Sequence, residues 1–223
     1  MIETRTPSLT ALFTARSAAR AAARRAVHGP APYGEAMQGS IPRDLGPAGA
    51  QALLVEVFEP STDRLAHSLG VGRRAEHVAH ALGLPELLVT AAYLHDIGYA
   101  AAARDTGLHQ LDGARYLRRL GASDALTSLV AHHTSALTEA GERHLDAHLR
   151  GEFPPPTDGE LLDLLTYCDM TTSATGRTVT IDERLECIYD RYAPGHLVSR
   201  SIHRAEPQLR RIVSTVDERM RLA

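Results

Sequence analysis

The chain has 223 residues and a formal net charge of −3 at pH 7, and all of its basic residues are arginine. This length is sufficient for a domain with a hydrophobic core, and the small charge carries no overall signature of nucleic-acid or membrane binding. Two cysteines are too few for a disulfide scaffold, and no apolar run approaches the roughly 18 residues of a membrane span. A cytoplasmic protein is therefore expected.

The N-terminal part of the chain differs in composition from the rest. Residues 8–28 are rich in Ala and Arg and contain no acidic residue, which predicts a helix or arm. Residues 29–49 hold 4 prolines and 5 glycines, which is typical of a connector. The predicted organisation is an arm with its connector over residues 1–58 and a helical domain over residues 59–223.

Helical signals dominate the remaining sequence. A short apolar helix over residues 50–58 precedes Pro60, and Ser61 or Thr62 can cap the helix that ends at Gly83. The next helix starts at Pro85 and leads into His95-Asp96. Further helices are expected over residues 108–120, 123–133, 137–149, 158–169 and 181–192. The β-like run at residues 177–180 is too short to form a sheet, so the predicted fold class is all-α.

The last segment carries apolar residues at helical spacing, namely Leu209, Ile212, Val213, Val216 and Met220. Such a stripe either packs on the core of its own chain or pairs with a second subunit. A homodimer through the C-terminal helix is therefore one expectation.

Residues that can bind a cation recur at helix ends and among apolar neighbours: His67, His95, Asp96, His109, His132, His133 and Asp169. A helical bundle that points such residues inward forms a metal site in its core. Imidazole and carboxylate ligands without cysteine suit Mn, Fe, Zn, Mg, Co or Ni and do not distinguish among them. Two ions about 3.5–4 Å apart, one of them presenting water or hydroxide, suit attack on a phosphate ester.

The order His67, His95-Asp96, Asp169 resembles the HD superfamily of metal-dependent phosphohydrolases. The string His95-Asp96-Ile97-Gly98 is similar to the HDIG form of the motif. His109, in the run of residues 109–114, and the doublet His132-His133 resemble the extra histidines of two-metal members. The resemblance covers about residues 60–175. It implies a helical bundle around a buried metal site, and we expect the helices within residues 181–222 to pack on that bundle.

The resemblance also implies roles for these residues. His67, His95, Asp96 and Asp169 would hold one metal, with His95 and Asp96 as the catalytic pair. A second metal would be held by His109 and either His133 or His132, and Asp96 would bridge the two ions. The chain lacks a Gly-Tyr-Pro sequence after the doublet, which argues against a cyclic-di-GMP phosphodiesterase. No Glu follows Asp96 closely, which argues against a mononuclear nucleotidase.

Substrate recognition is expected to use arginine, because a guanidinium matches phosphate geometry. Arg104 follows the HDIG turn and Arg177 follows Asp169, so the sequence favours these two over Arg64, Arg73, Arg74, Arg115 and Arg118. Specificity is expected in the loops at residues 97–108, 134–157 and 170–180.

The leading functional prediction is hydrolysis of a phosphate ester, of a nucleotide or another small phosphorylated metabolite, by metal-activated water. Two alternatives stay open from the sequence. One is a di-iron oxygenase of the HD type, and the other is a non-catalytic module that binds a metal or a nucleotide.

Overall fold

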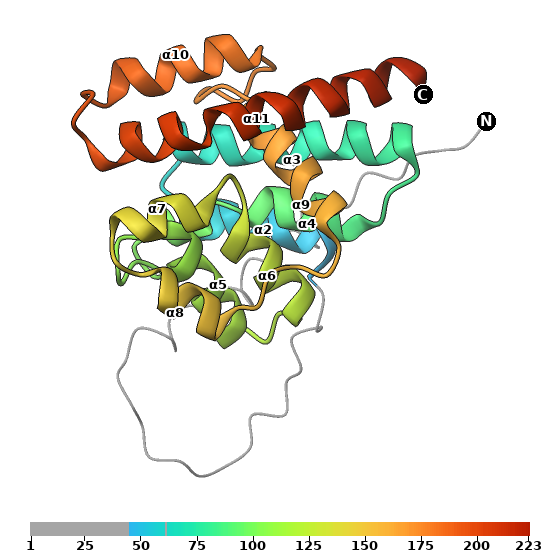
Figure 1. Cartoon of the computed structure of the whole chain (residues 1–223). Coiled ribbons are helices and arrows are strands. Elements are labelled where there is room, and N and C mark those ends of the chain that lie inside the picture. The colour runs from blue at the N-terminus through green and yellow to red at the C-terminus, as the bar shows by residue number, and fades with distance from the viewer. Residues whose placement is uncertain (1–44, 61) are drawn as a thin grey trace.

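A computed structural model describes residues 45–60 and 62–223, so the predictions for residues 8–28 and for most of the connector lie outside the described residues. The described part contains ten α-helices and one short 3-10 helix, η1, and the all-α prediction is confirmed (Figure 1). Its single β-type feature is an isolated bridge between Thr172 and Thr178. None of the described helices combines the length and apolar content needed to cross a membrane.

The elements follow one another in this order: α2 (Gly46–Val57), α3 (Asp63–Leu82), α4 (Glu86–Leu94), η1 (Ile97–Tyr99), α5 (His109–Arg119), α6 (Asp124–His132), α7 (Ala136–Glu142), α8 (Asp146–Glu152), α9 (Gly159–Met170), α10 (Ile181–Arg191) and α11 (Leu197–Leu222).

Most helix boundaries follow from local chemistry. The side chains of Thr62, Ser123 and Asp158 accept hydrogen bonds from backbone N–H groups in the first turns of α3, α6 and α9. The single helix expected over residues 137–149 is instead two helices, α7 and α8. His144 between them has a φ of 58°, in the left-handed region, and this backbone conformation ends the first helix.

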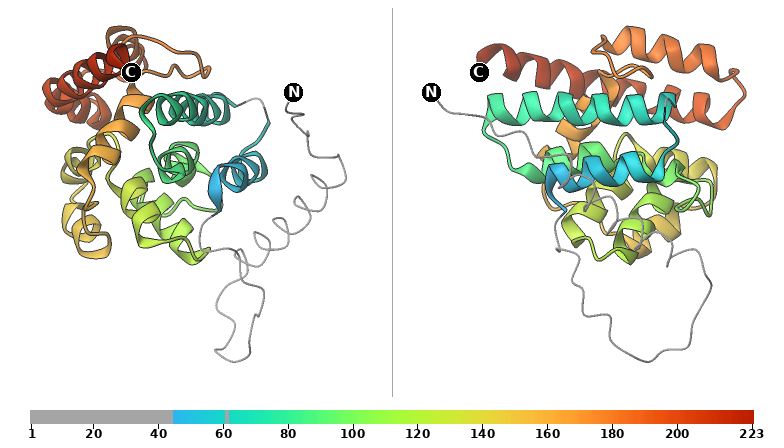
Figure 2. Two further views of the ribbon diagram at one scale, coloured as in Figure 1. Left: turned by 90° about the vertical axis from the view of Figure 1, so that its right-hand side faces the viewer. Right: turned by 180° about the vertical axis from the view of Figure 1, so that it is seen from behind.

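The core forms around α3 and α4, which pack side by side with α2 against α4 (Figures 1 and 2). Helix α2 buries Ala50, Leu53 and Leu54 in this contact. Residues 46–57 therefore pack with the helical core, although the predicted organisation groups them with the N-terminal arm. Helices α5 and α6 pack against each other on the other side of α4, next to η1.

The long helix α11 lies across α9 and α7 and runs beside α3 (Figures 1 and 2). Its apolar stripe is covered within the chain, because Leu209, Ile212, Val213 and Val216 are all buried there. Helix α10 precedes it as the other arm of a hairpin and buries only Leu185. This hairpin covers the end of the bundle at which α3 and α9 bring polar side chains together.

Candidate metal centre

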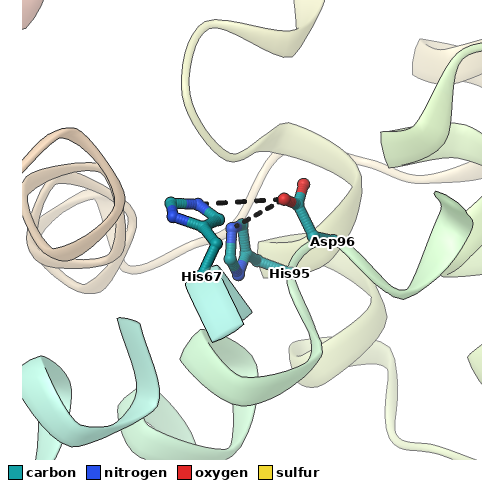
Figure 3. A group of neighbouring side chains, drawn as sticks. All are labelled: His67, His95 and Asp96. Carbon is teal, nitrogen blue, oxygen red and sulfur yellow. Dashed lines mark ion pairs between the residues drawn. The ribbon is translucent and has the colours of Figure 1, made fainter. Parts of the chain in front are cut away.

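Six predicted ligands meet at one buried point. His67 comes from α3, His95 and Asp96 from the turn after α4, His109 from the start of α5, His133 from the end of α6 and Asp169 from α9. Each is at most 9% exposed. Figure 3 shows His67 and His95 both directed at the carboxylate of Asp96, with Nε2 to Oδ2 distances of 3.8 and 3.4 Å.

Both carboxylates are shared among several histidines. Oδ1 of Asp169 lies 3.0 Å from Nε2 of His67 and 3.9 Å from Nε2 of His95. The other oxygen of Asp96, Oδ1, lies 3.2 Å from Nε2 of His109 and 3.9 Å from Nε2 of His133. Asp96 thus presents one oxygen to His67 and His95 and the other to His109 and His133, and it would suit a carboxylate shared by two ions.

Backbone carbonyls orient three of the rings. Nδ1 of His67 is 3.0 Å from the Ser173 carbonyl, while Nδ1 of His95 and of His133 bond carbonyls of their own preceding turns at 2.8 and 2.7 Å. A carbonyl only accepts, so each Nδ1 carries the proton and each Nε2 points its lone pair into the centre. Nε2 of His95 has no hydrogen-bond partner although it is fully buried.

This arrangement places acceptors against acceptors. Because the Ser173 carbonyl accepts from Nδ1, Nε2 of His67 is unprotonated. Its lone pair faces Oδ1 of Asp169 at 3.0 Å. Buried acceptors this close are stable only with a cation between or beside them. Three overlapping groups of potential ligands, His67-His95-Asp96, His95-His133-Asp169 and Asp96-His109-His133, each have ligand atoms within 4.8 Å of one another. The donor set therefore fits one or two divalent metal ions.

The electrostatics of the centre agree with that fit. Burial lowers the pKa of His67, and burial with the neighbouring rings lowers the pKa of His133 to about 3. Burial would raise the pKa of Asp96, but Arg64 and His95 hold it well below its usual value. Burial also acts against a charged His95, yet Asp96 and Asp169 raise its pKa. The two carboxylates are thus ionised and favour positive charge at this point.

The glycine of the HDIG string brings two ligands together. A Cβ atom on Gly98 would lie 1.9 Å from the carbonyl oxygen of His109 and 2.7 Å from the backbone nitrogen of Gly113. Only glycine therefore allows η1 to pack directly on the start of α5. This close packing sets the distance between Asp96 and His109.

A second pair of glycines positions His67. Gly176 has a φ of +76°, and a Cβ on Gly70 would lie 2.4 Å from its Cα atom. The loop after Asp169 can therefore lie directly on α3. That contact places the Ser173 carbonyl where it accepts from the ring of His67.

The structure does not bring every predicted site residue to this point. Nε2 of His132 bonds the carbonyl of Phe153 at 2.7 Å, so its ring is directed away from the cluster that His133 joins. Arg104 is exposed and donates to the Tyr99 carbonyl. Arg177 is also exposed, and neither arginine lines the cavity above the cluster. The phosphate-binding role expected of these two stays a prediction, because both side chains are exposed and lie outside that lining.

That cavity has a volume of about 470 Å³, with five of the six clustered residues in its lining. Three arginines also line it, Arg64 of α3 and Arg184 and Arg191 of α10, and Arg191 pairs with Asp63 at 3.4 Å. Arg64 pairs with Asp96 and stacks 3.9 Å above the ring of Tyr99. Arg184 lies 3.3 Å from Asp169. Arg64 precedes His67 by one helical turn, so the sequence already indicates that both lie on one face of the helix. Arg184 lies beyond residues 60–175, the part of the chain that resembles the HD superfamily, and no neighbouring residue indicates a role for it.

The comparisons with known proteins agree with this geometry. A family model described as "HD domain" matches residues 64–191, from the start of α3 to the end of α10. Ribonuclease Y of Chloroflexus aurantiacus is 44% identical over 70 residues, which is 31% of this chain and 14% of that protein. The match thus spans a small part of the relative's length. No solved structure matched the chain.

Proposed function

The chain belongs to the HD-domain family of metal-dependent phosphohydrolases, and on that premise we propose that it hydrolyses a phosphate ester of a small metabolite. The observation that carries the proposal is the convergence of four imidazole nitrogens and two ionised carboxylates beneath a cavity. This donor set would hold a first ion with His67, His95, Asp96 and Asp169. It would hold a second with Asp96, His109 and His133.

A bound divalent ion would supply an activated water and would neutralise charge on the phosphate. The protein's own contribution is positioning. The hydroxyl of Thr134 donates to Oδ2 of Asp169 at 2.5 Å and holds that carboxylate in place. The guanidinium of Arg64, supported by the ring of Tyr99, is a fixed donor for a phosphate oxygen. The buried surroundings of Asp96 exclude bulk water, which strengthens each of these interactions.

The size of the cavity supports a small substrate. A volume of about 470 Å³ falls in the range of pockets that enclose small molecules. Ribonuclease Y, as its name states, acts on RNA, but the similarity to it covers only 14% of its length. We therefore propose a nucleotide or sugar phosphate rather than an RNA chain as the substrate.

The test combines elemental analysis with a phosphate-release screen. Purified protein is analysed for bound metal, stripped, and assayed with each divalent ion on nucleotides and sugar phosphates. We expect metal-dependent phosphate release that His67→Ala and Asp96→Ala abolish. His77→Ala on the exposed side of the same helix α3 is the matched control and should retain activity. Full activity of the Asp96 variant would contradict the assignment.

The same donor set also suits iron, so the screen includes an oxygen electrode. Oxygen uptake by the iron-loaded protein, without phosphate release under any metal, would replace the hydrolase proposal with the oxygenase alternative. Nucleotide binding with neither reaction would support the non-catalytic module.

A further inference from the structure

Each of the two carboxylates of the metal centre forms an ion pair with one arginine. Arg64 pairs with Asp96, whereas Arg184 places its Nη2 atom 3.3 Å from Oδ1 of Asp169 and 3.5 Å from Nε2 of His67. Both guanidiniums line the same cavity. They come from elements far apart in the chain, α3 and α10, so their convergence depends on how the α10–α11 hairpin covers the bundle.

Arg184 is not needed to hold α10 in place. Other side chains fix that helix to α11: the hydroxyl of Tyr189 donates to Glu206 at 2.7 Å, and Arg210 bonds Asp182 at 2.6 Å. Asp169, for its part, already accepts a hydrogen bond from the hydroxyl of Thr134. The contacts of Arg184 therefore serve the metal centre, where its Nη2 lies beside the facing acceptors of His67 and Asp169, rather than the packing of α10 on α11.

The donors of Arg184 are also incompletely used. Its side chain is only 14% exposed, and its Nε atom is buried without a hydrogen-bond partner. A buried N–H that lacks an acceptor costs roughly 1–3 kcal/mol and is usually satisfied by water or a ligand. Arg184 lines the cavity, so an anion bound there would lie next to its guanidinium.

We propose that Arg184 binds substrate and, together with Arg64, selects the dianionic terminal phosphate of a phosphomonoester over a phosphodiester. This inference rests on the proposed function. A monoester presents three terminal oxygens and close to two negative charges, enough for two guanidiniums and the metal centre. A diester presents two such oxygens and one charge, so it leaves part of this donor set unused.

The part of the cavity that α10 and α11 line suits the alcohol portion of such a substrate. The lining includes the apolar side chains of Ile188 in α10 and of Val198 and Ile202 in α11, and Tyr192 from the turn between the two helices. An alcohol portion with an apolar or aromatic face would pack on these side chains. Specificity would thus reside on the α10–α11 hairpin together with the segments at residues 97–108, 134–157 and 170–180, which contribute Tyr99, Thr134 and Met170 to the lining.

The experiment compares p-nitrophenyl phosphate with bis-p-nitrophenyl phosphate as probes of the metal-loaded protein. We expect Arg184→Met to raise KM for the monoester roughly tenfold or more, the loss typical of a charge-assisted hydrogen bond, with a smaller change for the diester. Arg184→Lys should recover part of the loss, and guanidinium ion should partly rescue Arg184→Ala. Arg177→Met, at an exposed arginine outside the cavity, is the control.

Each outcome separates this inference from the function on which it rests. If the wild type hydrolyses both probes and Arg184→Met keeps the wild-type preference for the monoester, the role of Arg184 is overturned. The proposed hydrolase function is then unaffected. A fall in metal content matching the fall in activity would also overturn it, because Arg184 would then only support Asp169. If the wild type hydrolyses neither probe, calorimetry with inorganic phosphate decides, and equal affinity of wild type and Arg184→Met counts against the proposal.

Discussion

Nε2 of His67 lies 3.0 Å from Oδ1 of Asp169, although 102 positions separate the two residues in the chain. The Nδ1 proton of His67 is already given to the Ser173 carbonyl, so both facing atoms are acceptors. The guanidinium of Arg184 lies beside both atoms, and a divalent cation held between them would remove the remaining conflict.

The first prediction concerns the histidine doublet. His133→Ala should lower the metal content of the purified protein, because His133 directs Nε2 toward Asp96 at 3.9 Å. His132→Gln should leave the metal content unchanged, because His132 bonds the Phe153 carbonyl instead. Elemental analysis of both variants checks this. Loss of metal in the His132 variant alone would reverse the assignment.

Removing the metal should destabilise the protein. The lone pairs of His67, His95 and His133 and the two carboxylates would then face one another without a metal ion. Restoring an ion at about 100 times its Kd contributes about 2.7 kcal/mol of stability. Thermal unfolding with chelator and with added metal measures the shift in Tm. Asp169→Asn, which removes a carboxylate charge, should show a smaller shift, and an equal shift would contradict the shared site.

Gly98→Ala should destabilise the fold and disturb the centre. The added Cβ would lie 1.9 Å from the carbonyl of His109, and backbone cannot yield as a flexible side chain can. Forced overpacking costs about 1–3 kcal/mol or more, which urea unfolding detects. Gly141→Ala in α7 has no atom within 4 Å of its new Cβ and serves as the control. Equal stability of the two variants would contradict the packing argument.

Asp112→Asn should loosen the loop that follows the HDIG turn. The Asp112 carboxylate accepts from the backbone N–H groups of Asp105, Thr106 and Gly107 and from the Thr106 hydroxyl, at 2.7 to 3.1 Å. An amide keeps only one acceptor oxygen, so some of these donors lose their partner. Faster hydrogen exchange at residues 105–107 is the expected result. Unchanged exchange would show that another group holds the loop.

The pH dependence of stability should reveal the buried ring of His133. Its pKa falls to about 3 in the folded protein, because burial disfavours the charged form. The unfolded ring takes up a proton below about pH 6.5, so this residue contributes stability above that pH that is lost as pH falls toward 3.

The contribution of His133 can be isolated in chelated protein. Between pH 7 and pH 5, the free energy of unfolding should fall by about 2 kcal/mol more in the wild type than in His133→Gln. Urea unfolding at the two pH values measures the difference. A parallel loss in both proteins would mean that the ring is not kept neutral by burial.

The sequence by itself determined the helical fold class and most helix boundaries, because these depend on nearby residues. Thr62, Ser123 and Asp158 cap their helices through bonds within one turn. It also pointed to the residues that cluster, because several cation-binding side chains recur at helix ends in the order of the HD motif.

Only the tertiary structure decided the direction of each side chain and the contacts between distant segments. His132 and His133 are adjacent in the chain, yet the end of α6 sends one ring to Phe153 and the other into the cluster. Arg184 reaches Asp169 because α11 folds α10 back over the bundle. Such contacts depend on packing between helices far apart in sequence, and no local pattern of residues specifies this packing.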